Sequence, residues 1–246
     1  MAVLYGIHAV EQALKAGRPL ERLLVAEGRS GRAIDKLVAA ARARNVAVRF
    51  VARTELDRAA GNAAHQSVVA IAAAALYADF ETLIAQARKP ALFVVLDGVE
   101  DPRNLGAVLR TAHCAGADGV IVPERRAAGI TPAASKAAAG AAELIGVARI
   151  TNLGRALEQL KEAGCWLVGL DETANKTMAE ADFTGPVGIV LGGEGKGLHE
   201  HIRRKCDFLV SIPTFGAIRS LNVSVAAGVV LYEALRQRQA KEIARR

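Results

Sequence analysis

Short apolar runs and amphipathic stretches follow one another along most of the chain. In the first third, this pattern predicts helices over 5–16, 33–44 and 54–59, the last capped by Thr54, and strands over 23–26, 47–51 and 68–74. A helical connector at about 79–88 stops at Pro90. Later apolar runs, separated by helical stretches, predict strands over 92–96, 119–122, 166–170, 187–191 and 208–212. Strands that alternate with helices indicate an α/β fold with a mostly parallel sheet.

The same pattern divides the chain into three segments. Residues 1–75 form a compact α/β unit, residues 76–89 a linker, and residues 90–246 a second α/β unit that opens with a buried strand. A chain of 246 residues, 52% of them apolar, is long enough to bury a core in each unit. We therefore expect two domains.

The distribution of apolar residues and cysteines bounds the class of protein. No uninterrupted apolar stretch has membrane-spanning length, and the N-terminus lacks a signal-peptide pattern. Cys114, Cys165 and Cys206 lie far apart without Cys-x-x-Cys spacing, which is typical of reduced, buried thiols rather than of metal ligands. We expect a cytoplasmic protein with no membrane partner and no bound metal.

Positive charge is concentrated near the N-terminus. Residues 1–75 carry eleven Lys and Arg against six Asp and Glu, an excess of +5, whereas the rest of the chain carries 21 against 19, an excess of +2. Arginine suits bidentate phosphate contacts and stacking on bases. A polyanion partner and an ordinary solvated surface both fit the nine arginines concerned, which are Arg18, Arg22, Arg29, Arg32, Arg42, Arg44, Arg49, Arg53 and Arg58.

The most informative motif is a glycine-rich loop late in the chain. The apolar run 187–191 turns directly into Gly192-Gly193-Glu194-Gly195-Lys196-Gly197, where main chain can approach a ligand closely. The loop is not a Walker A motif, because Gly197 stands where Ser or Thr is needed. It is not a dinucleotide fingerprint either, because Leu198 replaces the third glycine. The loop can also be a simple glycine-rich turn.

Two further loops carry polar residues at strand ends. The strand before Pro213 leads to Ser220 and to Asn222, which stands at the start of the last apolar helix. After the strand 92–96, Asn104 is a plausible helix cap and Arg110 follows six residues later. Loops marked by Gly or Pro at the ends of apolar strands indicate a ligand crevice in an α/β sheet. Taken alone, Asn104 can be only a cap and Arg110 only a surface cation.

Taken together, these segments resemble the three motifs of the SpoU family, which are RNA ribose 2′-O-methyltransferases of the SPOUT superfamily. The matching segments are Asn104-x-Gly106-x-x-x-Arg110-Thr111, Leu191-Gly192-Gly193-Glu194-Gly195-x-Gly197, and Ile212-Pro213-x-x-Gly216-x-x-x-Ser220-Leu221-Asn222-Val223-Ser224-Val225-Ala226. The resemblance covers essentially all of 92–240. Residues 5–10 and 65–70 resemble the flanks of the family's ribosomal-protein-like RNA-binding domain.

The resemblance implies a C-terminal α/β domain with a deep trefoil knot, although knots are almost absent from proteins. It also implies S-adenosyl-L-methionine as cofactor and a homodimer through this domain, with each active site completed across the interface. Gly192, Ile212 and Leu221 are expected to contact the cofactor mainly through backbone atoms, and Gly169 and Leu170 to flank the adenine. The full set expected at the cofactor is Gly169, Leu170, Leu191, Gly192, Gly193, Gly195, Ile212 and Leu221.

The family pattern also implies catalytic roles. Arg110 is expected to clamp the phosphate beside the reacting ribose hydroxyl and to stabilise the developing alkoxide, whereas action as a base is unusual for a guanidinium. Asn104 and Glu194 would orient Arg110 or the ribose. Ser220 and Asn222 would offer hydroxyl and amide contacts, although Asn222 can instead simply cap the last helix.

Within the family, the resemblance is greatest to members that methylate a guanosine ribose of 23S ribosomal RNA. A transfer RNA ribose methyltransferase of the same family is the alternative, but such enzymes commonly lack a separate N-terminal domain. An inactive, ribosome-associated RNA-binding protein is a further alternative, which the intact Asn104, Arg110, Glu194 and Asn222 disfavour. Thr214, Ser67 and Arg219 depart from the usual family residues and bear on the RNA target.

Overall fold

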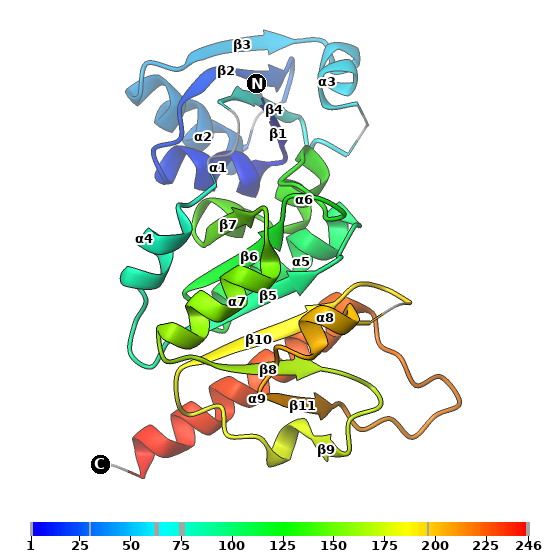
Figure 1. The fold of residues 1–246 in the computed structure, drawn as a ribbon. Coiled ribbons are helices and arrows are strands. Elements are labelled where there is room, and N and C mark those ends of the chain that lie inside the picture. The colour runs from blue at the N-terminus through cyan, green and yellow to red at the C-terminus, as the bar shows by residue number, and fades with distance from the viewer. Residues whose placement is uncertain (1, 30, 62–63, 74–76, 196, 245–246) are drawn as a thin grey trace.

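The structure is a computed structural model that describes residues 2–29, 31–61, 64–73, 77–195 and 197–244. It contains two sheets, one built by the N-terminal segment and one by the rest of the chain (Figure 1). The expected domain boundary at 75 and the expected end of a strand at Ala74 lie outside the described residues.

The first domain is a four-stranded sheet in the order β1-β4-β2-β3. Strand β4 pairs antiparallel with β1 and β2, whereas β2 and β3 are parallel neighbours. Its elements are β1 (Ala2–Tyr5), α1 (Ile7–Lys15), β2 (Leu20–Ala26), α2 (Arg32–Ala43), β3 (Ala47–Val51), α3 (Arg53–Ala60) and β4 (Val68–Ala72).

The second domain is a seven-stranded sheet in the order β7-β6-β5-β10-β8-β11-β9, with parallel pairing throughout. Its strands are β5 (Leu92–Asp97), β6 (Gly119–Pro123), β7 (Gly146–Ile150), β8 (Trp166–Leu170), β9 (Lys176–Thr177), β10 (Val187–Gly192) and β11 (Phe208–Ser211). Its helices are α4 (Phe80–Ala85), α5 (Pro102–Cys114), α6 (Pro132–Ala137), α7 (Leu153–Glu162), α8 (Glu200–Arg203) and α9 (Val223–Ile243), with 3-10 turns at Ala141–Glu143 and Met178–Glu180.

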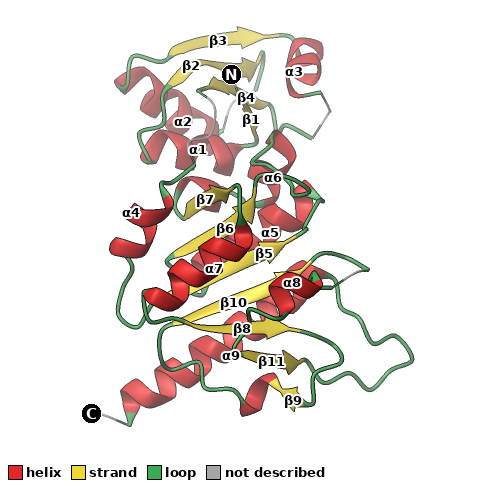
Figure 2. Ribbon diagram, in the orientation of Figure 1, coloured by secondary structure: helices red, strands yellow, loops and turns green. Residues whose placement is uncertain are grey.

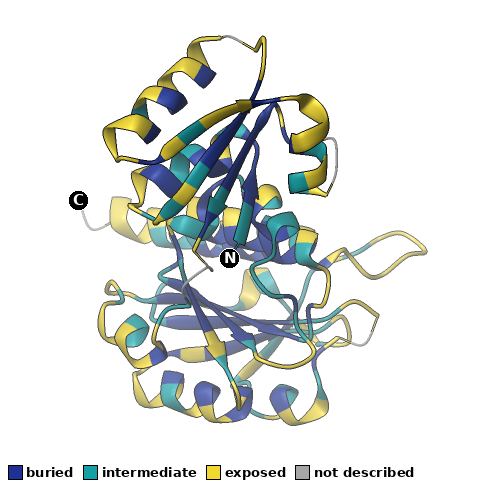
Figure 3. Cartoon of the chain, turned by 90° about the horizontal axis from the view of Figure 1, so that it is seen from above, coloured by how far each residue is buried: buried dark blue, intermediate teal, exposed yellow. Residues whose placement is uncertain are grey.

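Helices cover both faces of this sheet (Figure 2), so its central strands are buried on both sides. Alternate residues of β5 enter two different cores. Leu92, Val94 and Leu96 pack with α5 and α9, whereas Phe93 and Val95 pack with α7 and α8. Figure 3 shows the buried strands between exposed helix surfaces. Continuous apolar runs at 92–96 and 187–191 follow from this two-sided burial.

The connector between the domains packs into the second core. Helix α4 is present where a helical connector is expected, and Asp79 caps it by accepting a hydrogen bond from the Thr82 backbone N–H at 2.9 Å. Phe80 is buried, and a side chain at Gly119 or Gly146 would collide with Leu83. The described part of the 76–89 segment is thus integral to the second domain.

Polar contacts join the two domains. The Arg18 guanidinium forms an ion pair with Glu143, with side chains only 8% and 12% exposed, and also donates to the Ala73 carbonyl. Lys136 donates to the Ala64 carbonyl at 2.8 Å and lies over the ring of Tyr5. These contacts dock the first domain on α6 and the turn that follows it.

One arginine ties the last helix to the rest of the second domain. Arg238 of α9 donates four hydrogen bonds of 2.8 to 3.0 Å to the backbone carbonyls of Pro90, Ala91, Phe183 and Gly185. Burial lowers the pKa of this guanidinium from its usual value, but the group remains protonated. We call Arg238 and these four carbonyls the Arg238 clamp.

Several local expectations are wrong. Strands β1, β7 and β9 were not expected, and the first helix begins at Ile7 because β1 extends to Tyr5. Thr54 does not cap α3, which begins one residue earlier, at Arg53, after Ala52. Asn104 does not cap α5, because Asp101 accepts the capping bond from the Arg103 N–H at 2.7 Å. Among the three free thiols, Cys165 is buried, Cys206 is half-buried, and Cys114 is exposed rather than buried.

Candidate active site

The glycine-rich loop lies at the carboxyl end of β10, in the middle of the sheet. Gly193 and Gly197 face each other across the turn, with the Gly197 N–H donating to the Gly193 carbonyl at 3.1 Å. A Cβ at Gly192 would lie 2.0 Å from the Gly197 carbonyl carbon, and one at Gly193 would lie 2.1 Å from the Gly98 oxygen. The close approach of three backbone segments therefore requires these glycines.

Three candidate residues from distant parts of the sequence meet beside this loop. Glu194 Oε1 accepts a short hydrogen bond from Asn104 Nδ2 and a second from Asn222 Nδ2 at 3.2 Å. Asn222 Nδ2 also donates to Asn104 Oδ1 at 3.1 Å. We call Asn104, Glu194 and Asn222 the polar trio. A carboxylate accepts only, so two amide donors hold one of its oxygens in a fixed position.

Asn222 has a second role that the sequence also predicts. Its Oδ1 accepts from the Ser224 N–H at 2.9 Å and from the Ser224 hydroxyl at 2.6 Å, so it caps α9. The two alternatives for Asn222, a helix cap and a member of the polar site, are therefore both realised, by different atoms of one amide.

A cavity of about 480 Å³ opens beside the polar trio. Its walls come from the ends of β8 and β10, the loop after β11 and the start of α9. Nine of the expected site residues line it: Leu170, Leu191, Gly192, Gly193, Glu194, Gly195, Ile212, Ser220 and Leu221. The loop after β10 and the loop after β11 therefore line the same cavity.

The cavity is suited to a ligand that has both an apolar ring and polar groups. Leu170, Leu191 and Ile212 give apolar walls, and the glycine loop exposes backbone donors and acceptors. Small mixed cavities of this kind are typical of cofactor sites.

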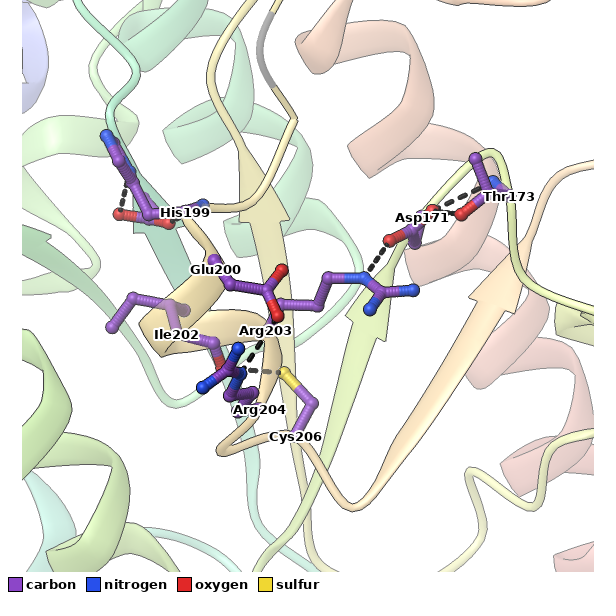
Figure 4. Close-up of polar contacts among 9 residues, drawn as sticks. Asp171, Thr173, His199, Glu200, Ile202, Arg203, Arg204 and Cys206 are labelled. Carbon is purple, nitrogen blue, oxygen red and sulfur yellow. Dashed lines mark hydrogen bonds and ion pairs between the residues drawn. The ribbon is translucent and has the colours of Figure 1, made fainter.

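Asp171 and Arg203, which form the ion pair drawn in Figure 4, both line the cavity. Asp171 Oδ2 accepts from Arg203 Nε at 2.6 Å, and Asp171 Oδ1 accepts from the Thr173 hydroxyl at 2.6 Å. Partial burial raises the pKa of Asp171, but the hydrogen bonds from Thr173 and Arg203 outweigh burial and hold that pKa below its usual value. An ionised carboxylate therefore stands at the edge of the cavity.

Three further expected site residues, Gly169, Ser220 and Gly195, differ in how they are placed. Gly169 is buried outside the cavity lining, where a Cβ would lie 2.8 Å from Cys206 Sγ and from Leu209 Cδ2. Core packing, rather than contact with a ligand, therefore requires a glycine at this position. Ser220 lines the cavity, and Ser220 and Gly195 are both exposed.

Arg110 is not joined to the polar trio. It is exposed on α5, does not line the cavity, and has no ion-pair or hydrogen-bond partner within the described residues. Six residues at about 100° each place Arg110 and Asn104 roughly 120° apart around the helix. The expectation that Asn104 and Glu194 orient Arg110 is therefore not met within one chain.

Two carboxylates of the site were not anticipated. Asp97 accepts from the His199 N–H at 2.8 Å and lies 3.0 Å from His199 Nδ1, and Asp171 belongs to the ion pair above. Each directly follows or ends an apolar strand of the parallel sheet. Polar residues at that position are a signal for a site, because the carboxyl ends of parallel strands share one edge.

Within the described residues, no group of three or more His, Cys, Asp or Glu side chains is arranged to hold a metal ion. Over the same ranges, no helix combines the length and the apolar composition that crossing a membrane requires.

Comparison with known proteins covers nearly the whole chain. Residues 91–232 match the SpoU rRNA Methylase family, and residues 3–78 match the family described as RNA 2′-O ribose methyltransferase substrate binding. The 23S rRNA (guanosine-2′-O-)-methyltransferase RlmB of Pseudomonas putida is 45% identical over 243 residues, which span 97% of each chain.

Two solved structures show how far the likeness extends. The SpoU methyltransferase AviRb from Streptomyces viridochromogenes, in complex with the cofactor AdoMet, is 27% identical with a TM-score of 0.84, and the match covers 97% of this chain and 90% of AviRb. The TrmH/SpoU tRNA modifying enzyme of A. aeolicus is 28% identical with a TM-score of 0.57, over 68% of this chain and 86% of that enzyme. The likeness to AviRb shows the SPOUT fold in the second domain, and together with the family matches it shows that this chain belongs to the SpoU family of RNA methyltransferases.

Proposed function

We propose that this protein transfers a methyl group from S-adenosylmethionine to the ribose 2′-hydroxyl of a guanosine in 23S ribosomal RNA. The polar trio carries the proposal, because it joins one residue from each of the three motifs. Its Glu194 lines the cavity of about 480 Å³, which we call the cofactor-sized cavity. A relative named for this reaction matches 97% of the chain at 45% identity, which supports the same RNA class.

The cavity residues fit the cofactor. Leu170, Leu191 and Ile212 would enclose the adenine, and the backbone of Gly192 to Gly195 would contact the ribose and the amino acid moiety. S-adenosylmethionine supplies an electrophilic methyl group on a sulfonium when it is bound. The protein's own task is then to bind and position the acceptor hydroxyl.

Glu194 is the group that we assign to the ribose hydroxyl. Its Oε1 is held by Asn104 and Asn222, whereas its Oε2 has no hydrogen-bond partner within the described residues. Oε2 can accept a hydrogen bond from the 2′-hydroxyl and hold that oxygen in one orientation. Ser220, which lines the same cavity, offers a hydroxyl to the same nucleotide.

Arg110 completes the site from a second copy of the chain. In one chain its guanidinium lies outside the cavity, although clamping a phosphate requires it beside the ribose. Four large apolar side chains near the cavity and on α9 are exposed, which is typical of an interface: Phe215 (100%), Ile218 (78%), Val225 (51%) and Tyr232 (52%). Val225 and Tyr232 are seven residues apart and share a helix face. The proposed dimer covers this face and brings each Arg110 to the partner's cavity.

A mixing experiment tests this arrangement. Arg110→Ala and Asn222→Ala chains, each inactive alone, are denatured together and refolded as mixed dimers. If Arg110 acts in the partner's site, random mixing restores about a quarter of the sites. If Arg110 acts in its own chain, every mixed dimer stays inactive. Light scattering on the unmodified protein checks the dimer itself, and a monomer at micromolar concentration contradicts it.

The first domain supports a ribosomal rather than a transfer RNA target. Seven of its arginines are exposed without an ion pair inside the described ranges: Arg29, Arg32, Arg42, Arg44, Arg49, Arg53 and Arg58. Arg18 and Arg22 are paired with glutamates instead and are not counted in this surface. The match to the A. aeolicus tRNA enzyme covers only 68% of this chain, whereas the match to the 23S enzyme covers 97%.

Mass mapping of ribose methylation decides between the targets. RNA from cells with and without the gene is digested and compared, and the purified protein is then tested on the RNA that changes. Loss of one 2′-O-methylguanosine from 23S RNA is expected. Loss from a transfer RNA would establish the alternative, and no loss together with no S-adenosylmethionine binding by calorimetry would indicate an inactive RNA-binding protein.

A further inference from the structure

A second cavity lies on the other side of the glycine-rich loop. It measures about 530 Å³, and Gly193, Glu194 and Gly197 line both it and the cofactor-sized cavity. Asn104 of the polar trio also faces the second cavity. The trio therefore stands at the boundary between two spaces, one assigned to the cofactor and one not yet assigned.

Most of the acidic side chains in this second cavity already have structural partners. Asp97 holds His199 through two contacts, and Asp101 accepts the capping bond of α5. Glu100 and Arg126 differ. Both are exposed, both line the cavity, and neither has a hydrogen-bond or ion-pair partner in the described part of the chain. Besides Glu194, which the polar trio holds through one oxygen, the cavity thus presents one uncommitted carboxylate and one uncommitted guanidinium.

The loops that carry these two side chains are fixed to each other. The Ala128 N–H donates to the Val99 carbonyl at 2.8 Å, next to Arg126 on one loop and Glu100 on the other. Arg126 has a φ of 55°, a left-handed backbone that a residue other than glycine rarely adopts. Strain of this kind persists only where surrounding structure imposes it, and it collects at ligand sites.

A carboxylate beside an RNA site would repel phosphates unless it meets a donor on the nucleotide. Guanine is the base with two adjacent donors, N1–H and the N2 amine, on its Watson–Crick edge, and a carboxylate accepts both through its two oxygens. The O6 and N7 acceptors of guanine match the paired donors of a guanidinium. An uncommitted Glu and an uncommitted Arg in one cavity therefore complement this base.

We infer that the second cavity binds the base of the target guanosine, with Glu100 reading N1–H and the N2 amine and Arg126 contacting O6 and N7. This inference rests on the proposed function and names the residues that set its base specificity. With the base in this cavity, the ribose lies at Asn104 and Glu194, between the base and the cofactor.

The test compares target RNA that carries guanosine with the same RNA carrying inosine, which lacks only the N2 amine. Single-turnover methyl transfer by the unmodified protein is expected to be about ten- to a hundredfold slower on inosine, the loss of a hydrogen bond to a charged group. Glu100→Gln should slow transfer to guanosine by a similar factor. It should slow transfer to inosine less, because inosine offers only N1–H at this position and the glutamine oxygen still accepts from it, so the ratio of the two rates falls toward one. Glu162→Gln, the same change at an exposed position on α7, should keep the original ratio.

Arg126→Gly removes the guanidinium and suits the left-handed backbone, so the fold should be retained. Because guanosine and inosine share O6 and N7, this variant should slow both RNAs equally. The unfolding midpoint and S-adenosylmethionine affinity of each variant are measured alongside and should match those of the unmodified protein.

An unchanged guanosine-to-inosine ratio in Glu100→Gln, or an equal loss on both RNAs, would overturn the assignment of Glu100. The proposed function itself is tested separately, with the unmodified protein. If it fails to methylate guanosine RNA at all, the proposed function is wrong; if it succeeds and the variants do not discriminate, only the base site is wrong.

Discussion

The buried ion pair between Arg18 and Glu143 predicts that Glu143→Ala weakens the docking of the two domains. Removing one partner of a buried pair costs about 3–5 kcal/mol, because the other charge stays without compensation. Arg18 keeps its hydrogen bonds to the Ala73 carbonyl, so we expect the lower end of that range, about 3 kcal/mol. That loss corresponds to roughly a hundredfold change in the equilibrium between docked and undocked domains.

Urea unfolding followed by far-UV circular dichroism measures the stability loss, and methyl transfer to RNA measures its consequence. The transfer rate should fall with docking, whereas S-adenosylmethionine affinity should not change, because no residue of the first domain lines the cofactor-sized cavity. The matched control is Glu21→Ala. Its pair with Arg22 is 44% and 41% exposed, so it should cost at most about 1 kcal/mol.

A double-mutant cycle separates the pair from other effects of the substitutions. Arg18→Met together with Glu143→Ala should cost clearly less than the sum of the two single changes, because the second change removes a charge that has already lost its partner. If Glu143→Ala costs no more than Glu21→Ala, or if the two changes add, the ion pair does not hold the domains and the reasoning fails.

Three further predictions follow from the site and the cores. Arg110→Ala should abolish transfer while leaving cofactor affinity nearly intact in calorimetry, and Arg110→Lys should restore little because a point charge lacks the guanidinium fork; near-full activity of the lysine variant would contradict a bidentate clamp. A fragment that starts at Tyr77 should fold and bind S-adenosylmethionine, whereas one that starts at Pro90 should be less stable by about 3–5 kcal/mol in urea, since it lacks the buried Phe80. Alkylation at pH 8 followed by mass spectrometry should label the exposed Cys114 well before Cys206, since burial raises the pKa of the Cys206 thiol to about 12 and leaves little thiolate below that pH; equal labelling would contradict the burial.

The sequence predicts the elements that are buried on both faces better than those at the edges. The strands β5, β8 and β10 are continuous apolar runs, so their positions and the glycine loop after β10 were found from the pattern alone. Strand β7 carries the exposed Arg149 near the edge of its sheet, and β9 has only two residues, so neither has a clear period. The cap of α5 was misassigned although Asp101 before Pro102 is itself a helix-start signal.

Contacts between residues distant in sequence were beyond a reading of local pattern. Arg18 and Glu143 are separated by 125 positions. The helix period places Asn104 and Arg110 on different faces of α5, but the sequence does not show which face lies beside the cavity. The second cavity is of the same kind, because Glu100 and Arg126 lie on two loops that only the backbone hydrogen bond between Ala128 and Val99 shows to be neighbours. The polar trio was anticipated only because a family resemblance linked its three segments.

The clamp made by Arg238 has a consequence for the order in which the chain acquires structure during translation. The first domain is complete by Ala72 and has cores of its own, so it can fold as soon as it leaves the ribosome. The second domain cannot, because α9, at the end of the chain, supplies Val230 and Leu231 to its core as well as the Arg238 clamp. At ordinary rates of synthesis the remaining residues take roughly 10 to 30 s to appear. During that interval the first domain, rich in arginine, is folded while the second domain is still incomplete. The ion pair between Arg18 and Glu143 can therefore form only after α9 has been synthesised.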